Sequence, residues 1–257
     1  MAKKKLNAQR VIQSGLFVFF FCTFVIGAYL TVSTIIEDSK AKTAYKDIQD
    51  QIHPTDAPSG DAEKVSIDFD ALQSIDKNVK AWINLPGTIV DYPIVQGSDN
   101  VHYLRHLITG EYNKCGTLFI DYRCPDPFND KNTIIYGHHN KQGLMFAEFK
   151  NYSSQEYYEK HKTLYLYTPE GTYLLEMLSM TTENGAKEFV RFNLKDDQDF
   201  LDYIEGLRRR STFKSDAVVS KEDQIISFVT CSYEWTNARY LLVAKMTRIS
   251  EEPAGEQ

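Results

Sequence analysis

A thiol, an imidazole and a guanidinium stand at the ends of apolar runs in this sequence. Cys231 ends one such run, and Arg239 opens the next. The pair His138 and His139 follows an earlier run, after a glycine. A thiolate is a nucleophile, an imidazole can exchange its proton, and a fixed cation can stabilise the oxyanion that forms on an attacked carbonyl. The set is therefore compatible with acyl transfer in which Cys231 is the nucleophile.

The runs beside these residues are short and rich in β-branched side chains, which is typical of strands. If the runs at 225–230 and 240–244 pair as neighbours, the loop of seven residues between Cys231 and Arg239 leaves both of these residues at one rim of a sheet. Strand ends are rigid positions from which a side chain can be aimed. We therefore expect a site on the rim of a β-structure.

Each of these residues also has a structural interpretation. A single cysteine after a strand is often a small buried residue, and an arginine that opens a strand is often a solvated edge charge. Gly-His-His is more often a packed turn, or a fragment of a metal site, than half of a catalytic pair. Since no HExxH pattern or third ligand accompanies the histidines, we expect neither a metal nor a cofactor.

The elements that would carry the site are mostly strands. Helical spacing of apolar residues predicts helices over 154–161 and 196–210 and one helical segment that spans Phe69 to Ile83. Strands are expected at 89–95, 117–122, 133–136, 163–167, 173–180, 224–233 and 240–249. Many short strands with few helices predict a mainly β fold, a closed or half-closed barrel.

The N-terminus predicts a membrane anchor. Residues 15–36 carry no charge and form a run of about 20 residues, enough to cross a bilayer as a helix. Lys3, Lys4, Lys5 and Arg10 precede this run, and acidic residues follow it. The positive-inside rule then places the N-terminus in the cytoplasm and the rest of the chain outside the cell. A cleaved signal peptide is the alternative, and it exports the same residues.

Five segments follow from this pattern. They are a basic cytoplasmic N-terminus (1–14), a transmembrane anchor (15–36), an extracellular stalk (37–64), a catalytic domain (65–250) and a flexible C-terminal tail (251–257). The stalk is expected to be helical over 40–51 and flexible after that, where prolines and polar residues gather.

Charge and cysteine content limit the function further. The net charge is −6, and the basic N-terminus means that the exported part is more acidic still, so nucleic-acid binding is not expected. Of the four cysteines, Cys22 lies in the apolar run. Cys115 and Cys124 could form a disulfide, which sequence alone leaves open.

Several segments together resemble the class B branch of the sortases, the cysteine transpeptidases of Gram-positive cell surfaces. The resemblance covers about 65–250 and includes the helix expected before the cysteine strand. The matching segments are Ala81-Trp82-Ile83-Asn84-Leu85-Pro86-Gly87-Thr88, Asp91-Tyr92-Pro93-Ile94-Val95-Gln96-Gly97, Asp99-Asn100, Ile134-Ile135-Tyr136-Gly137-His138-His139, Met145-Phe146, and Val229-Thr230-Cys231 with Arg239. The ordered set is much more specific than any single motif.

The resemblance implies a sortase-like closed barrel and a mechanism. Cys231 would attack the threonine carbonyl of a C-terminal sorting motif, Asn-Pro-x-Thr-Gly or -Asn in this branch, and form a thioacyl enzyme. His138, which directly follows the glycine, would protonate the departing amine and later deprotonate the incoming one. Arg239 would steady the oxyanion or hold the substrate backbone. An amine of the cell-wall precursor, or a pilin lysine, would accept the secreted protein.

The resemblance also implies a substrate groove and a location. The groove residues would be Asn100, Tyr136, Thr230, Phe189 and Val190, the last two from the connection before the helix at 196–210. Ser232 departs from relatives that carry an acidic residue there. The enzyme would be a single-pass protein of the cell membrane, with its catalytic domain extracellular.

Other classes of protein remain as alternatives. Papain-like peptidases carry the cysteine before the histidine, whereas His138 comes first here. L,D-transpeptidases place a His-Gly pair just before the cysteine, and this chain has Val229 and Thr230 there. A tethered β-barrel that binds peptide or haem, with Cys231 inert, is the non-catalytic alternative.

Overall fold

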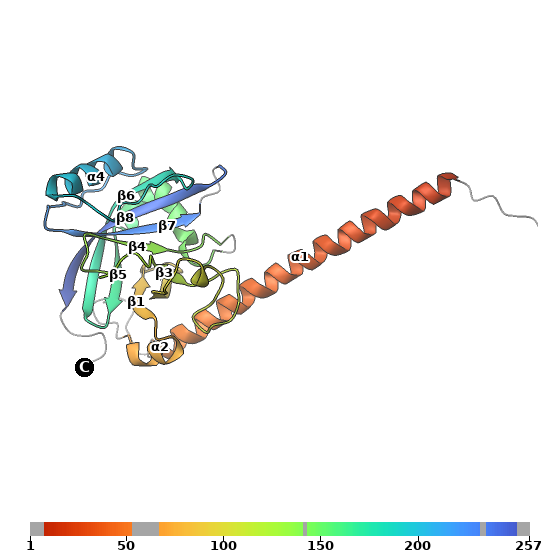
Figure 1. Cartoon of the computed structure of the whole chain (residues 1–257), viewed down its shortest axis with the longest axis horizontal. Coiled ribbons are helices and arrows are strands. Elements are labelled where there is room, and N and C mark those ends of the chain that lie inside the picture. Colours follow the sequence, from red (N-terminus) through yellow and green to blue (C-terminus); the bar gives the residue numbers. More distant parts are fainter. Residues whose placement is uncertain (1–7, 53–66, 141–142, 232–234, 251–257) are drawn as a thin grey trace, which may run out of the picture.

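A computed structural model of the protein describes residues 8–52, 67–140, 143–231 and 235–250. These residues form a closed β-barrel from which one long helix projects (Figure 1). Around the barrel the strands follow the order β1-β2-β3-β4-β7-β8-β6-β5, and β1 pairs with β5 to close it. Their bounds are β1 Val79–Asn84, β2 Asp91–Val95, β3 Leu118–Ile120, β4 Asn132–Tyr136, β5 Thr163–Thr168, β6 Gly171–Asn184, β7 Gln224–Cys231 and β8 Ala238–Ser250.

Two parallel pairings interrupt the antiparallel barrel. β2 pairs with β3 in parallel, and β4 pairs with β7 in parallel, while the other neighbours run antiparallel. Parallel neighbours need a long connection. The connection from β4 to β7 contains β5, β6 and the helix α4, and it brings the C-terminal ends of β4 and β7 to the same rim.

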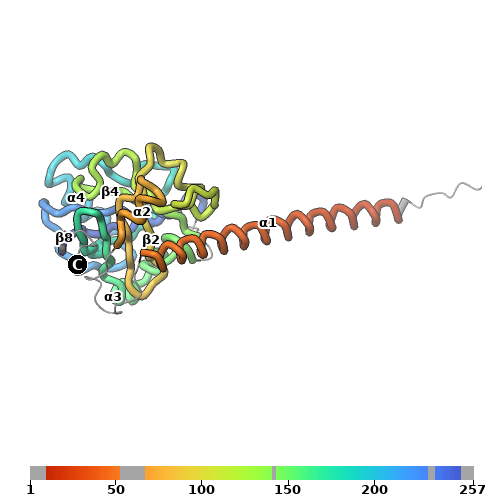
Figure 2. The backbone as a smooth tube through the Cα atoms, turned by 90° about the horizontal axis from the view of Figure 1, so that it is seen from below, coloured from red at the N-terminus to blue at the C-terminus, as the bar shows by residue number. Residues whose placement is uncertain are grey.

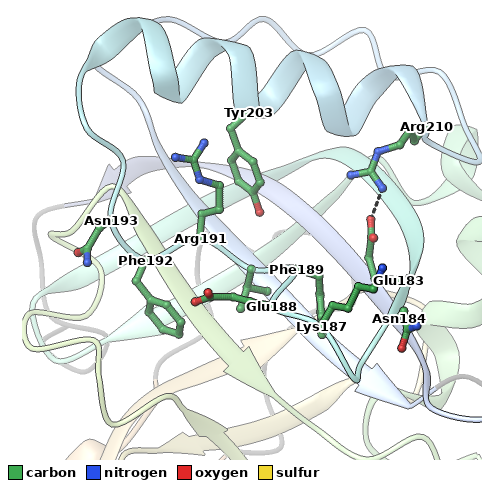
Figure 3. Close-up of a pocket in the computed structure, with 11 residues that line it drawn as sticks. Glu183, Asn184, Lys187, Glu188, Phe189, Arg191, Phe192, Asn193, Tyr203 and Arg210 are labelled. Atoms are coloured by element: carbon green, nitrogen blue, oxygen red, sulfur yellow. Dashed lines mark hydrogen bonds and ion pairs between the residues drawn. The ribbon is translucent and has the colours of Figure 1, made fainter.

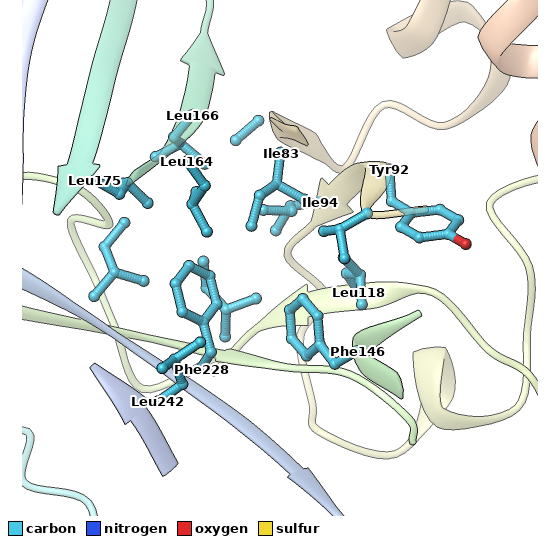
Figure 4. Close-up of a cluster of buried hydrophobic side chains, with 14 of the residues drawn as sticks. Ile83, Tyr92, Ile94, Leu118, Phe146, Leu164, Leu166, Leu175, Phe228 and Leu242 are labelled. Carbon is cyan, nitrogen blue, oxygen red and sulfur yellow. The ribbon is translucent and has the colours of Figure 1, made fainter. Parts of the chain in front are cut away.

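The barrel interior is a continuous apolar core. Figure 4 shows side chains from strands on all sides of the barrel meeting there, among them Ile83, Ile94, Leu166 and Phe228. Each of these is at most 1% exposed, so strands from distant parts of the sequence share one core. This core fixes the rim on which the expected site lies, and the predicted closed barrel is confirmed.

Short helices surround the barrel. They are α2 Phe69–Ile75, α3 Gln155–Lys160, α4 Asp197–Arg209 and the 3₁₀ helices η2 His102–Leu104 and η3 Phe146–Ser153. The helices expected at 154–161 and 196–210 are therefore present. Asp196 caps α4 by accepting a hydrogen bond from the amide of Asp199 at 2.9 Å. Figure 1 shows α4 on the outside of the barrel, where it packs against β6.

One sequence-based expectation is wrong. The single helical segment expected to span Phe69 to Ile83 ends at Ile75, and Val79–Asn84 is strand β1. β1 lies between β2 and β5, and Ala81, Trp82 and Ile83 are all buried. A strand that is buried on both faces loses the polar–apolar alternation that identifies a strand, and its apolar residues then fit helical spacing equally well.

The helix α1 runs unbroken from Ala8 to Ile52 and projects as a rod from the barrel (Figure 1). Its part Arg10–Ile52 is long and apolar enough to cross a membrane by length and composition, and none of its apolar window is buried. The C-terminal part of the rod packs against the barrel near β2, as Figure 2 shows from below. Ala41, Tyr45 and Ile48 are buried in this contact.

The first part of the segment expected as a stalk is thus a helix that is attached to the domain along its length. Residues 53–64, the remainder of that segment, lie outside the described residues. The tail 251–257 and the N-terminal 1–7 also lie outside them.

Cys115 and Cys124, the pair that could have formed a disulfide, are not bonded to each other. Cys115 and Cys124 are both present as thiols and are both buried. Burial raises the pKa of Cys115 to about 12, and the charge of Asp38 adds to the effect. Burial likewise raises the pKa of Cys124 to about 11.

Candidate active site

The backbone register brings the predicted catalytic positions to one rim of the barrel. Cys231, the last residue of β7, pairs with Arg239 of β8, which in turn pairs with Glu183 of β6. On the other side of β7, Tyr136 of β4 pairs with Val229. His138 follows Tyr136 by two residues, so its backbone continues beside the end of β7.

Gly137 allows the segment before His138 to lie against the barrel. Its amide donates to the Val229 carbonyl at 3.1 Å, which extends the β4–β7 ladder by one residue. A Cβ atom at this position would lie 2.4 Å from side-chain carbons of both Leu118 and Phe146. A side chain therefore does not fit without displacing the core, and the glycine is required by close packing.

The His138 imidazole is held by a backbone carbonyl. Its Nε2 lies 2.9 Å from the carbonyl oxygen of Leu104. A carbonyl oxygen only accepts, so Nε2 carries the proton of the neutral ring and Nδ1 is the nitrogen able to take another. Burial lowers the pKa of His138 below its ordinary 6.5; the Leu104 bond opposes this, and the positive charge of Arg105 adds to it. The ring is therefore mostly neutral at pH 7.

We expect the acid limb of the pH profile of kcat/KM to have its midpoint below pH 6.5. A thiol–imidazole couple reacts when it holds one proton, and lowering the pH through its lower macroscopic pKa adds a second proton and stops the reaction. Arg105→Ala removes a cation near the ring, so the midpoint should move upward. The exposed Arg209 on α4 provides the control, since Arg209→Ala should leave the profile unchanged. A midpoint above 6.5, or one that Arg105→Ala does not move, would contradict this assignment.

His139 is packed into the structure differently. Its side chain is only 9% exposed, and its ring lies 6.2 Å from the ring of Tyr240, centroid to centroid. Its backbone forms an isolated bridge with Met145. These contacts favour a packing role for His139.

Arg239 presents a guanidinium at the same rim. Its Nη1 donates to the Ala238 carbonyl at 2.9 Å, and within the described parts of the chain no carboxylate pairs with it. Glu183, its neighbour in register, pairs instead with Arg210 at 2.5 Å (Figure 3). The side chain lies against Gly185, where an added Cβ would come 2.9 Å from the Arg239 Cγ. Its positive charge is therefore not neutralised by Glu183.

Two of the expected groove residues meet at the segment that follows β3. The Asn100 side-chain oxygen accepts from the amide of Tyr122 at 3.1 Å. The Tyr136 hydroxyl donates to the carboxylate of Asp121 at 3.0 Å. The structure thus brings Asn100 and Tyr136 together through neighbouring residues of one turn.

Asp121 and Arg123 form part of this arrangement and were not identified from the sequence. Arg123 donates two side-chain hydrogen bonds to the Asp121 carboxylate, at 2.8 and 3.0 Å. Burial works against ionisation of Asp121, but the bonds from Arg123 and Tyr136 outweigh it and hold the pKa of this carboxyl below its ordinary value. The sequence signal that could have identified them is an acidic and a basic residue placed just after an apolar run.

The connection before α4 carries the other two residues expected in the groove. Phe189 and Val190 line a cavity of about 530 Å³ between this connection and α4 (Figure 3). Phe192 of the same cavity lies under the guanidinium of Arg123, 4.1 Å from its carbon to the ring centroid. Through Arg123, the connection before α4 and the turn after β3 are in contact.

Thr230 differs from the other expected groove residues because it is 3% exposed. Its hydroxyl has no hydrogen-bond partner in the described part of the protein. It therefore lies beside Cys231 in sequence without forming an open wall of the groove. Across residues 8–52, 67–140, 143–231 and 235–250, no three His, Cys, Asp or Glu side chains gather as metal ligands would.

Comparison with known proteins decides the family. The sortase domain model matches residues 83–247. This chain belongs to the sortase family. Sortase B of Staphylococcus aureus (strain NCTC 8325 / PS 47) is 32% identical to this sortase over 228 residues, which cover 88% of this chain and 93% of the relative.

Solved structures agree with the sequence comparison. The Staphylococcus aureus sortase B–substrate complex superposes on this sortase with a TM-score of 0.74 at 31% identity, covering 84% of this chain and all of the other. A sortase B complexed with triglycine has the same TM-score and identity and covers 83% of this chain and all of the other. The sortase is accordingly a class B transpeptidase, and neither another cysteine peptidase nor a non-catalytic barrel is better supported. Sortases are cysteine enzymes of the cell surface.

Proposed function

We propose that Cys231 is the nucleophile of this class B sortase, that His138 is its general acid and base, and that Arg239 stabilises the oxyanion. The neutral imidazole of His138 takes the proton of the Cys231 thiol, the resulting thiolate attacks the substrate carbonyl, and a tetrahedral oxyanion forms beside the guanidinium. The imidazolium of His138 protonates the departing amine as the C–N bond breaks, which leaves a thioester. The neutral imidazole then takes a proton from the incoming amine as it displaces the sulfur, and a new amide forms.

The backbone register at the rim is the observation that carries this proposal. Cys231 is paired directly with Arg239, and β4 brings His138 to the neighbouring end of β7. The lowered pKa of His138 leaves a neutral ring able to take a proton, and no described carboxylate neutralises Arg239. The imidazole of His138 and the guanidinium of Arg239 therefore have chemical states that suit the roles proposed for them.

The proposed substrate is a secreted protein with a C-terminal sorting motif of the Asn-Pro-x-Thr-Gly or -Asn kind, cleaved after threonine. The existence of a sortase B–substrate complex among similar structures supports a peptide substrate, and the complex with triglycine supports an amine acceptor. The acceptor is a cell-wall precursor amine or a pilin lysine. Asn100, Tyr136, Thr230, Phe189 and Val190 are proposed to bind the motif, with Thr230 acting through its position beside Cys231.

The proposed topology has α1 spanning the cell membrane once, with the N-terminus in the cytoplasm and the barrel outside. The apolar helix α1 and the basic residues that precede its apolar run in the sequence support this orientation.

A mass-spectrometric assay tests the reaction. We expect the full-length protein, incubated with peptides that vary the first and last positions of the motif, to gain the mass of the acyl part of the peptide on Cys231, with preference for asparagine over leucine at the first position. Addition of triglycine should discharge the adduct and give a peptide extended by three glycines. An adduct on another residue, or turnover without any adduct, would overturn the proposed mechanism; a preference for leucine would overturn the proposed motif.

A further inference from the structure

The docked end of α1 holds the segment that carries His138. We call the described residues 138–140 and 143–145 together the histidine loop. Asp38 of α1 accepts a hydrogen bond on Oδ1 from the side-chain amide of Asn140, at 2.8 Å. Asn140 is two residues beyond His138, so a residue just after the apolar part of α1 is bonded to the loop that carries the imidazole.

Asp38 is an unusual residue to find at this contact. Its side chain is only 8% exposed, and its second oxygen has no hydrogen-bond donor in the part of the chain that the structure describes. Its charge also reaches the buried thiol of Cys115 and adds to the rise in the pKa of that thiol. A buried carboxylate with one donor is costly, and apolar residues of similar size are often more stable in such positions. Stability therefore does not explain Asp38, whereas attachment of the histidine loop does.

A second contact from α1 reaches the other end of the same loop. The ring of Tyr45 packs edge-on against that of Tyr92, with centroids 5.4 Å apart, and the Tyr92 hydroxyl accepts from the amide of Met145 at 3.4 Å. Met145 has φ 58° and ψ −127°, a conformation that a residue with a side chain rarely adopts and that persists where surrounding contacts impose it. The next amide, of Phe146, donates to the His138 carbonyl at 3.0 Å and closes the loop.

We propose that Asp38 is a positioning residue for His138, acting through Asn140, so that the juxtamembrane part of α1 belongs to the catalytic apparatus. This rests on the proposed role of His138. The Asp38–Asn140 bond fixes the start of the loop, and the Tyr45–Tyr92 pair fixes its end at Met145. With both ends of the loop fixed, the His138 imidazole stays bonded to the Leu104 carbonyl, and its backbone stays beside the end of β7.

The test uses the full-length protein in detergent micelles. Asp38→Ala and Asn140→Ala should each lower kcat by about tenfold with KM unchanged, as expected for a small displacement of a catalytic group. Tm should stay unchanged or rise in Asp38→Ala, which removes a buried carboxylate, and should fall in Asn140→Ala, which takes the Asn140 donor away from that carboxylate. Asp38→Asn keeps an acceptor oxygen for Asn140 and should restore most of kcat. Lys40→Ala is the matched control, because Lys40 lies on the same helix and forms only an exposed pair with Glu111, at 3.2 Å. It should behave as the unaltered protein.

The double variant Asp38→Ala/Asn140→Ala separates a shared bond from two independent effects. If both residues act through one bond, the double variant loses no more kcat than either single variant. Multiplied losses, a lower Tm with normal kcat in the single variants, or no effect on either quantity would overturn the proposal. His138→Ala distinguishes the two levels of inference: if that variant is inactive while the Asp38 and Asn140 variants are normal, only the positioning role fails, whereas an active His138→Ala variant removes the proposed mechanism itself.

Discussion

Replacing Cys231 by alanine is expected to reduce turnover of a sorting-motif peptide by more than about 10³-fold, since loss of a nucleophile removes the covalent route altogether. Tm should stay unchanged, because one small residue at a strand end replaces another. Steady-state hydrolysis and transpeptidation of the same peptide, together with thermal unfolding of the purified full-length variant, measure both quantities.

Alkylation at neutral pH gives an independent measurement on the same variant. Cys115 and Cys124 are buried, with pKa values raised to about 12 and about 11, so their thiolate fractions are negligible at pH 7. A rapidly alkylated thiol in the domain must then be Cys231, and Cys231→Ala should abolish rapid labelling. Cys124→Ala is the matched control and should keep both labelling and turnover. Cys22 is an exposed thiol on α1, so peptide mapping assigns the labelling to α1 or to the domain. Retained turnover in Cys231→Ala, or fast labelling of the domain that survives the substitution, would exclude Cys231 as the nucleophile.

The strands could be predicted from the sequence because turn residues separate short runs of β-branched and aromatic residues. The strands β2, β3 and β7 lie within the stretches expected for them, and β4, β5, β6 and β8 include theirs and extend beyond them, β6 by four residues at its C-terminal end. β1 was missed because consecutive residues that point to opposite faces of the strand, Ala81, Trp82 and Ile83, are all buried. The polar–apolar alternation on which strand prediction depends is absent there.

The docking of α1 left a signal in the sequence that was not used. Ala41, Tyr45, Ile48 and Ile52 are all buried, and their spacing of four, three and four residues is that of one helix face. A stripe of this kind predicts a helix packed against a partner. A solvated stalk would not require it.

Some contacts of the site could be predicted from the sequence, and others could not. The pairing of Cys231 with Arg239 follows from two adjacent strands and a short connection, so the sequence was sufficient to predict it. The Leu104 carbonyl that holds His138, and the contact of Arg123 with Phe192, join residues far apart in the chain. Such contacts depend on how the barrel closes, and no local pattern encodes them.

His138→Ala is expected to lower kcat/KM for transpeptidation by about 10²–10⁴-fold, the usual contribution of a positioned general acid and base. Its partner in sequence, His139, provides the matched control. The His139 ring is buried beside Tyr240, so His139→Ala should lower Tm, while kcat/KM stays within about tenfold of the unaltered protein.

The roles of His138 and His139 can be distinguished further by asking which step of the reaction each variant loses. Without a proton donor for the departing amine, His138→Ala should form the thioacyl adduct slowly, and a substrate with an activated leaving group that needs no protonation should restore much of the rate. The adduct is measured by quenched-flow mass spectrometry with both substrates. Since Nδ1 of His138 is the nitrogen left to exchange a proton once Nε2 bonds to Leu104, rescue by the activated substrate in the His138 variant alone is the expected result. Rescue in the His139 variant, with normal amide turnover in the His138 variant, would transfer the catalytic role to His139.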